Sequence, residues 1–170
     1  MFSVLDEFTP KELIAIGQMA VGYADLDFFI TLCAATLLRC RDAEIGWQAI
    51  ARMDFSGKCE RLKELLRHYQ TKFNVLPDPA FNELIHAIGR CKSVGGERNQ
   101  VIHSHIHYDG PSWKPVFRHS RTGGTVDATP EALNTLAIEM SSLAHDCFMA
   151  IDGFSYVLER LDVASVDQNG

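Results

Sequence analysis

The chain has 170 residues, 46% of them hydrophobic, which is enough for one domain of ordinary size to bury a sizeable core. Its formal net charge of −6 argues against a general affinity for nucleic acid. The longest apolar-type run, residues 28–38, has about half the length that a membrane span requires, and no basic region precedes an apolar one at the N-terminus. We therefore expect one soluble, cytoplasmic domain over residues 1–170, with no membrane contact.

The first predicted helix begins with a capping box. Thr9 can accept from free amide groups, Pro10 suits the first helical position, and Glu12 completes the box. From there to Leu38 the segment is apolar around most of its circumference, which predicts a helix covered on more than one side. A second protomer could provide one of these covers.

Two further helices are expected before residue 77. Residues 44–53 predict a short helix, Phe55-Ser56-Gly57 predicts a break, and residues 58–73 predict a second main helix. The chain has five cysteines, an odd number, and four of them lie in helix-like segments without C-x-x-C spacing, which indicates buried thiols in a reducing compartment. These cysteines are Cys33, Cys40, Cys59, Cys91 and Cys147.

A third long helix begins at Pro79, after Asp78 as a cap, and its apolar pattern lasts until His107. At about 100° per residue, Asn99 falls near the centre of the apolar stripe, with Arg98 and His103 on its shoulders. Each of these polar groups would cost about 1–3 kcal/mol there if it were unpartnered. The pattern therefore predicts three polar side chains that are turned away from bulk water.

The last part of the chain contains turn chemistry followed by a final helix. Residues 108–126 predict a small hairpin or an ordered loop and no sheet, and a helix starts at Pro130 and keeps a spacing of 3–4 residues for about thirty residues. We expect the polar tail, 164–170, to be disordered. The predicted fold class is all-α: an antiparallel four-helix bundle with an extra short helix and the hairpin or loop between the last two long helices.

The segment from His86 to Arg121 is basic although the protein is acidic. Its net charge is +4, the rest of the chain sums to −10, and the segment holds five of the seven histidines. Such a region is a candidate anion site, although a charge cluster is more often a solvated surface.

The run Arg98-Asn99-Gln100-Val101-Ile102-His103 resembles the R-N-x-x-x-H signature of the HEPN superfamily. The resemblance implies a helical bundle that dimerises and, in many members, a metal-independent ribonuclease that acts as a toxin or defence effector. It implies catalytic roles for Arg98 and His103 and an orienting role for Asn99. The looser pattern of the family also fits Arg61 with His68 and Arg98 with His105.

The chemistry of RNA cleavage fits these residue types. Attack by the 2′-hydroxyl requires a base, an acid and a cation for the phosphorane, which histidine and arginine can supply without a metal or another cofactor. Because one chain offers one such pair, a two-fold homodimer would bring two copies to one groove. The residues expected to bind phosphate or RNA are Arg118, Arg121, His105 and His107.

Two alternatives remain open. The first is a non-catalytic HEPN-like dimeric binding or regulatory module, in which the polar trio fixes dimer geometry and the partner is an antitoxin or regulatory protein. The second is a zinc site, because His103 and His107 would share one face of a helix, and His103, His105 and His107 would alternate in an extended segment. Apart from Asp109, the sequence offers no obvious carboxylate or cysteine nearby as a further ligand.

Overall fold

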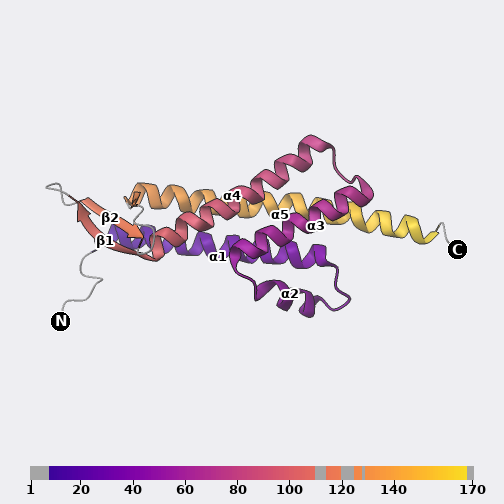
Figure 1. Cartoon of the computed structure of the whole chain (residues 1–170), viewed down its shortest axis with the longest axis horizontal. Coiled ribbons are helices and arrows are strands. Elements are labelled where there is room, and N and C mark those ends of the chain that lie inside the picture. Colours follow the sequence, from indigo (N-terminus) through magenta and orange to yellow (C-terminus); the bar gives the residue numbers. More distant parts are fainter. Residues whose placement is uncertain (1–7, 110–113, 120–124, 128, 168–170) are drawn as a thin grey trace. The chain divides into compact units, whose positions relative to one another are not determined.

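The fold consists of helices joined by short connections and one small sheet (Figure 1). A computed structural model describes residues 8–109, 114–119, 125–127 and 129–167, with the backbone alone for Asp78, the strands and residues 161–167. In this described part the helices are α1 (Pro10–Leu38), α2 (Ala43–Ala51), α3 (Phe55–Phe73), α4 (Asp78–Ile102) and α5 (Pro130–Asp167). The predicted helical fold class is confirmed at this level, and the antiparallel bundle arrangement stays a prediction.

The capping box at the start of α1 is confirmed. The Thr9 amide donates to Glu12 Oε2 at 2.7 Å, and the Glu12 amide donates to Thr9 Oγ1 at 3.3 Å. These two bonds satisfy two amide groups that a helix leaves free at its first turn. At the start of α5, the Ala132 amide donates to Thr129 Oγ1 at 3.2 Å, as the Thr-Pro-Glu sequence suggests.

The predicted break at residues 55–57 is wrong, because α3 begins at Phe55. Asp54 caps this helix by accepting from the Gly57 amide at 2.8 Å. A Cβ at residue 57 would lie 2.6 Å from Asp54 Oδ1, so the glycine leaves room for the capping carboxylate. Gly57 thus belongs to a helix start, although glycine usually indicates an interruption.

The segment between α4 and α5 forms more than the predicted hairpin or loop. Strands β1 (Ser104–Asp109) and β2 (Lys114–His119) pair in antiparallel fashion, and β3 (Thr125–Asp127) pairs with β2. The hairpin is therefore extended to a three-stranded sheet in the order β1-β2-β3. The expectation of no sheet failed because the pairing of β3 with β2 depends on contacts across the chain, which a loose local alternation does not reveal.

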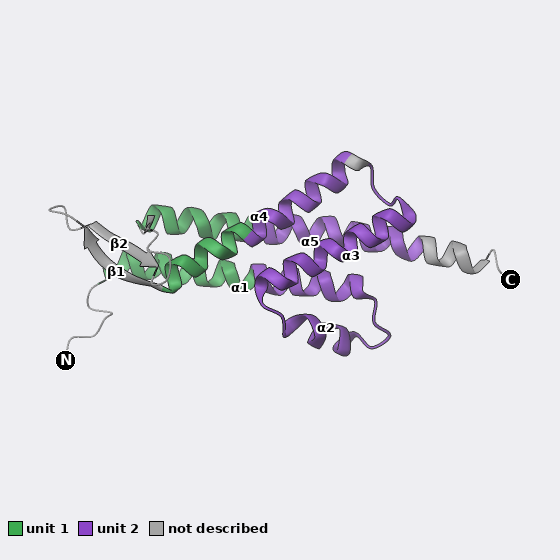
Figure 2. Cartoon of the chain, viewed as in Figure 1, with its two compact units in different colours: residues 1–25, 93–142 green, residues 26–92, 143–170 purple. Residues whose placement is uncertain are grey.

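The chain divides into two compact units (Figure 2). Unit 1 comprises residues 1–25 and 93–142, and unit 2 comprises residues 26–92 and 143–170. α5 runs to Asp167 and so includes residues 164–167 of the expected tail, whereas 168–170 lie outside the described residues. Buried side chains of α5 recur every three or four residues, as predicted. They are Leu133, Leu136, Ala137, Met140, Ala144, Cys147, Ile151, Phe154 and Leu158.

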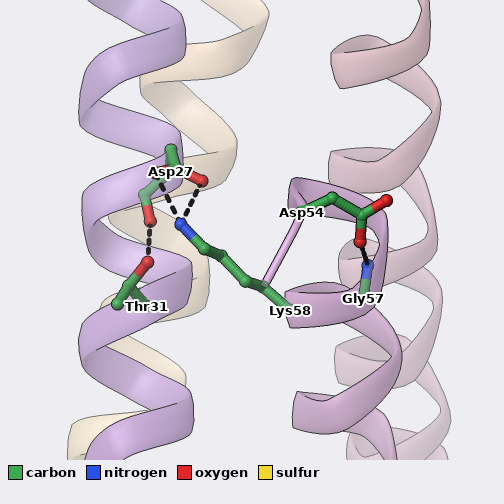
Figure 3. A network of polar contacts seen from close by, with 5 residues as sticks. All are labelled: Asp27, Thr31, Asp54, Gly57 and Lys58. Carbon is green, nitrogen blue, oxygen red and sulfur yellow. Dashed lines mark hydrogen bonds and ion pairs between the residues drawn. The ribbon is translucent and has the colours of Figure 1, made fainter. Parts of the chain in front are cut away.

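An ion pair in unit 2 joins α1 to α3 (Figure 3). Lys58 Nζ lies 2.8 Å from both carboxylate oxygens of Asp27, and the Lys58 residue is only 5% exposed. Thr31 Oγ1 donates to the Asp27 carbonyl oxygen at 2.6 Å one turn along α1. The lysine is therefore held between two helices of this unit, and the sequence pattern of α3 gave no sign of its burial.

The helix α1 is also apolar in composition. By length and composition it qualifies as a membrane-spanning helix, with 39% of the most apolar window buried. Core helices of soluble proteins and signal sequences meet the same criterion. The prediction of buried cysteines is confirmed for the four that lie in helices and is wrong for Cys40, which is exposed.

Candidate functional site

The buried face of α4 decides where the R-N-x-x-x-H motif points. The buried residues of the helix are Leu84, Ile88, Cys91, Val94, Gly95 and Val101. Leu84 and Cys91 are seven residues apart, as are Val94 and Val101. This spacing corresponds to 3.5 residues per turn, and a straight 100° wheel drifts from it by about 20° per heptad.

This drift makes the placement of Asn99 on the apolar stripe wrong. Two heptads after Leu84, the residue on the buried face is Arg98, which is half-buried, whereas Asn99 is exposed. Likewise, Val101 is 2% exposed and Ile102, the next residue, is 41% exposed. Arg98 is therefore the motif residue that points inward, and Asn99 and His103 are solvent-exposed.

Two contacts within unit 1 hold the Arg98 guanidinium. Its Cζ lies 4.3 Å from the ring centroid of Tyr23 on α1, within the range of a cation–π interaction. Its Nη1 donates to Asn99 Oδ1 at 2.9 Å. Its Nε is buried and has no hydrogen-bond partner among the described residues. Tyr23 was missed at the sequence level, because no local pattern pairs it with an arginine far along the chain.

His103 lies directly after the last residue of α4. Its amide donates to the Asn99 carbonyl oxygen at 3.0 Å and so closes the final helical turn. Because the helix ends at Ile102 and β1 begins at Ser104, His103 and His107 do not share a helical face, and that basis for a zinc site is wrong. Asn99 and His103 are one helical turn apart, which places both exposed groups at the C-terminal end of α4.

The other predicted phosphate-binding residues lie on the sheet or beyond it. His105 and His107 are in β1 and Arg118 is in β2, where the register pairs His105 with Arg118 and His107 with Val116. Their side chains and the whole of Arg121 lie outside the described residues. The backbone thus brings His105 and Arg118 to opposite positions of one ladder, two residues along the chain from His103.

An apolar groove in unit 1, the α1/α5 groove, was not predicted as a site. Its volume is about 900 Å³, and its lining includes Ile14, Gly17, Val21, Gly22, Ala137 and Ile138. Ile14, Val21 and Ile138 are 60%, 63% and 70% exposed. The two helices approach closely here, since a Cβ on Gly22 would lie 2.9 Å from the Ala137 carbonyl oxygen. The apolar circumference of α1 predicted a helix covered on more than one side, whereas this face of it is exposed.

The lining of the groove carries no charged side chain, and α1 has none between Glu12 and Asp25. Asn134 lines the groove too, and its Oδ1 is buried without a hydrogen-bond partner among the described residues. Exposed apolar patches rimmed by polar groups commonly mark interaction surfaces.

The chemistry available at the end of α4 is that of phosphate recognition and proton transfer. The guanidinium of Arg98 is a permanent cation with a planar fork, Asn99 offers an amide, and the imidazole of His103 can accept or donate a proton near neutral pH. One chain supplies one copy of each group. Comparison with family models, curated proteins and solved structures gives no match for this chain.

Proposed function

We propose that this protein is a HEPN-like, metal-independent endoribonuclease of the toxin or defence type, with Arg98 and His103 at a groove between two protomers. The observation that carries the proposal is the arrangement of the motif at the end of α4. A guanidinium stacked on Tyr23 stands beside an exposed amide and an exposed imidazole within one helical turn and a half. Cytoplasmic location and the absence of membrane contact belong to the same proposal.

The roles follow from the geometry of each group. Arg98, restrained by Tyr23 and Asn99, would bind the scissile phosphate and stabilise the charge of the phosphorane. His103 would remove the proton of the 2′-hydroxyl or protonate the leaving 5′-oxygen. Asn99 orients the guanidinium, because its Oδ1 accepts from Arg98 Nη1. His105, His107, Arg118 and Arg121 would bind neighbouring phosphates of the RNA.

Burial of Arg98 Nε supports a functional reason for this arginine. An unpaired buried N–H costs about 1–3 kcal/mol, which folding stability alone does not explain. Groups that carry such a cost concentrate at functional sites.

The homodimer belongs to the proposal, because acid and base must come from two copies of His103. The exposed apolar side chains of Ile14, Val21 and Ile138 support pairing of two chains through the α1/α5 groove. The whole assembly would then be an antiparallel bundle doubled by a two-fold axis.

The alternative is a non-catalytic HEPN-like binding or regulatory module that meets an antitoxin or regulatory protein. One observation favours it: the stacking of Arg98 on Tyr23 joins α4 to α1 within a single unit, so the arginine also serves a structural purpose. In that case removing Arg98 destabilises the fold and no RNA is cut.

RNA cleavage in the presence of excess chelator separates the two functions. The parent should cleave a single-stranded RNA, and His103→Ala and Arg98→Ala should lower the rate at least about 100-fold while the far-UV circular dichroism stays unchanged. The matched control is His68→Ala, which removes an exposed α3 histidine that also fits the loose motif. Cleavage by both motif variants at the parent rate contradicts the proposal, and an inactive parent favours the binding module.

A further inference from the structure

Four cysteines lie in the interior of unit 2, each contributed by a different helix. Cys33 is on α1, Cys59 on α3, Cys91 on α4 and Cys147 on α5, and each is at most 2% exposed. Cys91 and Cys147 are the closest described pair, with Sγ atoms 3.6 Å apart, and all five cysteines of the chain are free thiols. No group of three or more possible ligands is placed to hold a metal ion among the described residues, so the pair is considered as thiols.

We propose that Cys91 and Cys147 form a site of reversible oxidation, in which a hydroperoxide converts the two thiols to a disulfide between α4 and α5. The contact between the sulfur atoms means that a small movement of the side chains suffices for bond formation. This thiol site is independent of the proposed nuclease, because it lies in unit 2 and includes none of the motif residues.

Either sulfur atom can donate in the hydrogen bond between the two thiols, which lie 3.6 Å apart. Contact with Cys91 lowers the pKa of Cys147, against the effect of burial, and the same contact together with burial raises the pKa of Cys91. Burial raises the pKa of both Cys33 and Cys59 to about 12, and the charge of Cys147 adds to the shift in each case. Since the thiolate is the nucleophile, Cys147 reacts first and Cys91 resolves the product.

The oxidation takes place in two steps. The Cys147 thiolate attacks one oxygen of the hydroperoxide, the O–O bond breaks, and sulfenic acid and an alcohol (water, from hydrogen peroxide) result, the leaving oxygen having taken up a proton. Cys91 then attacks the sulfenic sulfur, the S–O bond breaks, and water leaves with the Cys91 proton. Two thiols lose two electrons in total, and the peroxide is reduced. Burial selects a small oxidant, because a bulky disulfide such as oxidised glutathione cannot approach a sulfur that is 0–2% exposed.

The glutamates of the chain make the linkage readable by peptide mapping. Cleavage after Glu83 and Glu97 gives peptide 84–97 with Cys91 as its one cysteine, and cleavage after Glu139 and Glu159 gives peptide 140–159 with Cys147 as its one cysteine. Cys33 and Cys40 fall together on 13–44, and Cys59 falls on 45–60. Trypsin is unsuitable, since cleavage after Arg90 and after Lys92 would leave Cys91 on the dipeptide 91–92.

The test exposes the reduced full-length protein to hydrogen peroxide, blocks the remaining thiols under denaturing conditions, and digests without reductant. We expect one cross-linked species that joins 84–97 to 140–159, with a mass about 2 Da below the sum of the two peptides. It should persist in Cys40→Ser, which removes the exposed cysteine, and be absent from Cys91→Ser. Linkage of 140–159 to 13–44 or 45–60, or recovery of both peptides with blocked thiols, would overturn the proposal even if Cys91→Ser fails to fold.

Thermal unfolding gives a second measurement. The cross-link would close a loop between positions separated by 56 residues, so the oxidised parent should melt several degrees higher than the reduced parent. Addition of a dithiol reductant should restore the original midpoint. A cross-linked protein that melts at or below the reduced midpoint contradicts the claim that the native fold already places these sulfurs for bonding.

Discussion

At the scale of single residues, the pair of Lys58 and Asp27 holds a buried lysine between α1 and α3 in unit 2. The lysine side chain is 6% exposed and the aspartate side chain 34%, so Lys58 depends on this carboxylate more than the reverse. Replacement of Lys58 by methionine keeps the apolar stem and removes both charge-assisted bonds. We expect the free energy of unfolding to fall by about 1–3 kcal/mol in Lys58→Met, measured by denaturant titration.

The control for this prediction is Arg61→Met on the same helix. Arg61 pairs with Glu64 at 3.1 Å, but the two side chains are 41% and 61% exposed, and exposed pairs contribute at most about 1 kcal/mol. An equal loss of stability in the two variants would contradict the prediction that the buried pair of Lys58 contributes more than the exposed pair of Arg61.

The limits of sequence reasoning are clearest at Arg98 and Asn99. The motif itself could be located from residue types and spacing. The identity of the side chain that points inward could not be predicted. A repeat of 3.5 instead of 3.6 residues per turn moves the buried face of α4 by one residue at this position, and the repeat depends on how α4 packs against its neighbours. The contacts of Tyr23 and Asp27 could not be predicted either, since their partners Arg98 and Lys58 lie far away along the chain and no local sequence period connects them.

At the scale of elements, the close approach of α1 and α5 in unit 1 depends on Gly22. Alanine there would gain helix propensity but place its Cβ 2.9 Å from a backbone oxygen, which cannot move without displacing α5. We expect Gly22→Ala to lower the free energy of unfolding by about 1–3 kcal/mol. The comparison is Gly153→Ala on α5, where a Cβ meets nothing within 4 Å and stability should rise by about 0.5–1 kcal/mol. Equal effects of the two substitutions would contradict the close packing.

The contact between α3 and α4 in unit 2 predicts a pH dependence. The hydrogen bond from Lys92, 2.9 Å long, lowers the pKa of Glu60 below its ordinary 4.5, and it raises the pKa of Lys92 above 10.5. The contribution of Glu60 to the free energy of unfolding is therefore present above pH 4.5 and is lost as the pH falls through its folded-state pKa. The contribution of Lys92 is lost only as the pH rises above 10.5.

Denaturant unfolding of the parent and of Lys92→Met at two pH values tests the direction of this pH dependence. The parent should be slightly more stable than Lys92→Met at pH 7, by a small amount because both groups are exposed, and the difference should shrink as the pH falls below 4.5. A difference that grows in acid would show that the assigned partner is wrong.

Helix positions were largely predictable, because capping residues and apolar periods are local signals. Thr9 and Glu12 fixed the start of α1, and Thr129 and Pro130 that of α5. The start of α3 was missed because Phe55-Ser56-Gly57 has the composition of a break. These residues form a helical turn that is capped by Asp54, whose carboxylate accepts from the Gly57 amide. The sheet was missed in part because β3 has three residues and gains its order from β2.

At the scale of the whole molecule, the proposed dimer can be tested through the α1/α5 groove. Val21 is 63% exposed there, and a glutamate in its place would bury a charge in any interface that covers the groove. We expect the parent to be a dimer and Val21→Glu a folded monomer in light scattering. Met149→Glu, which changes an exposed apolar residue of α5 outside the groove, should stay dimeric. A monomeric parent, or a dimer in both variants, contradicts pairing through this surface.

RNA cleavage in excess chelator, assayed across the fractions of a size-exclusion column, tests the proposed dimer and the proposed motif together. We expect activity to follow the dimer peak of the parent and to disappear from the same peak of His103→Ala. A dimer peak without activity, or cleavage that persists in the His103→Ala fractions, would contradict it.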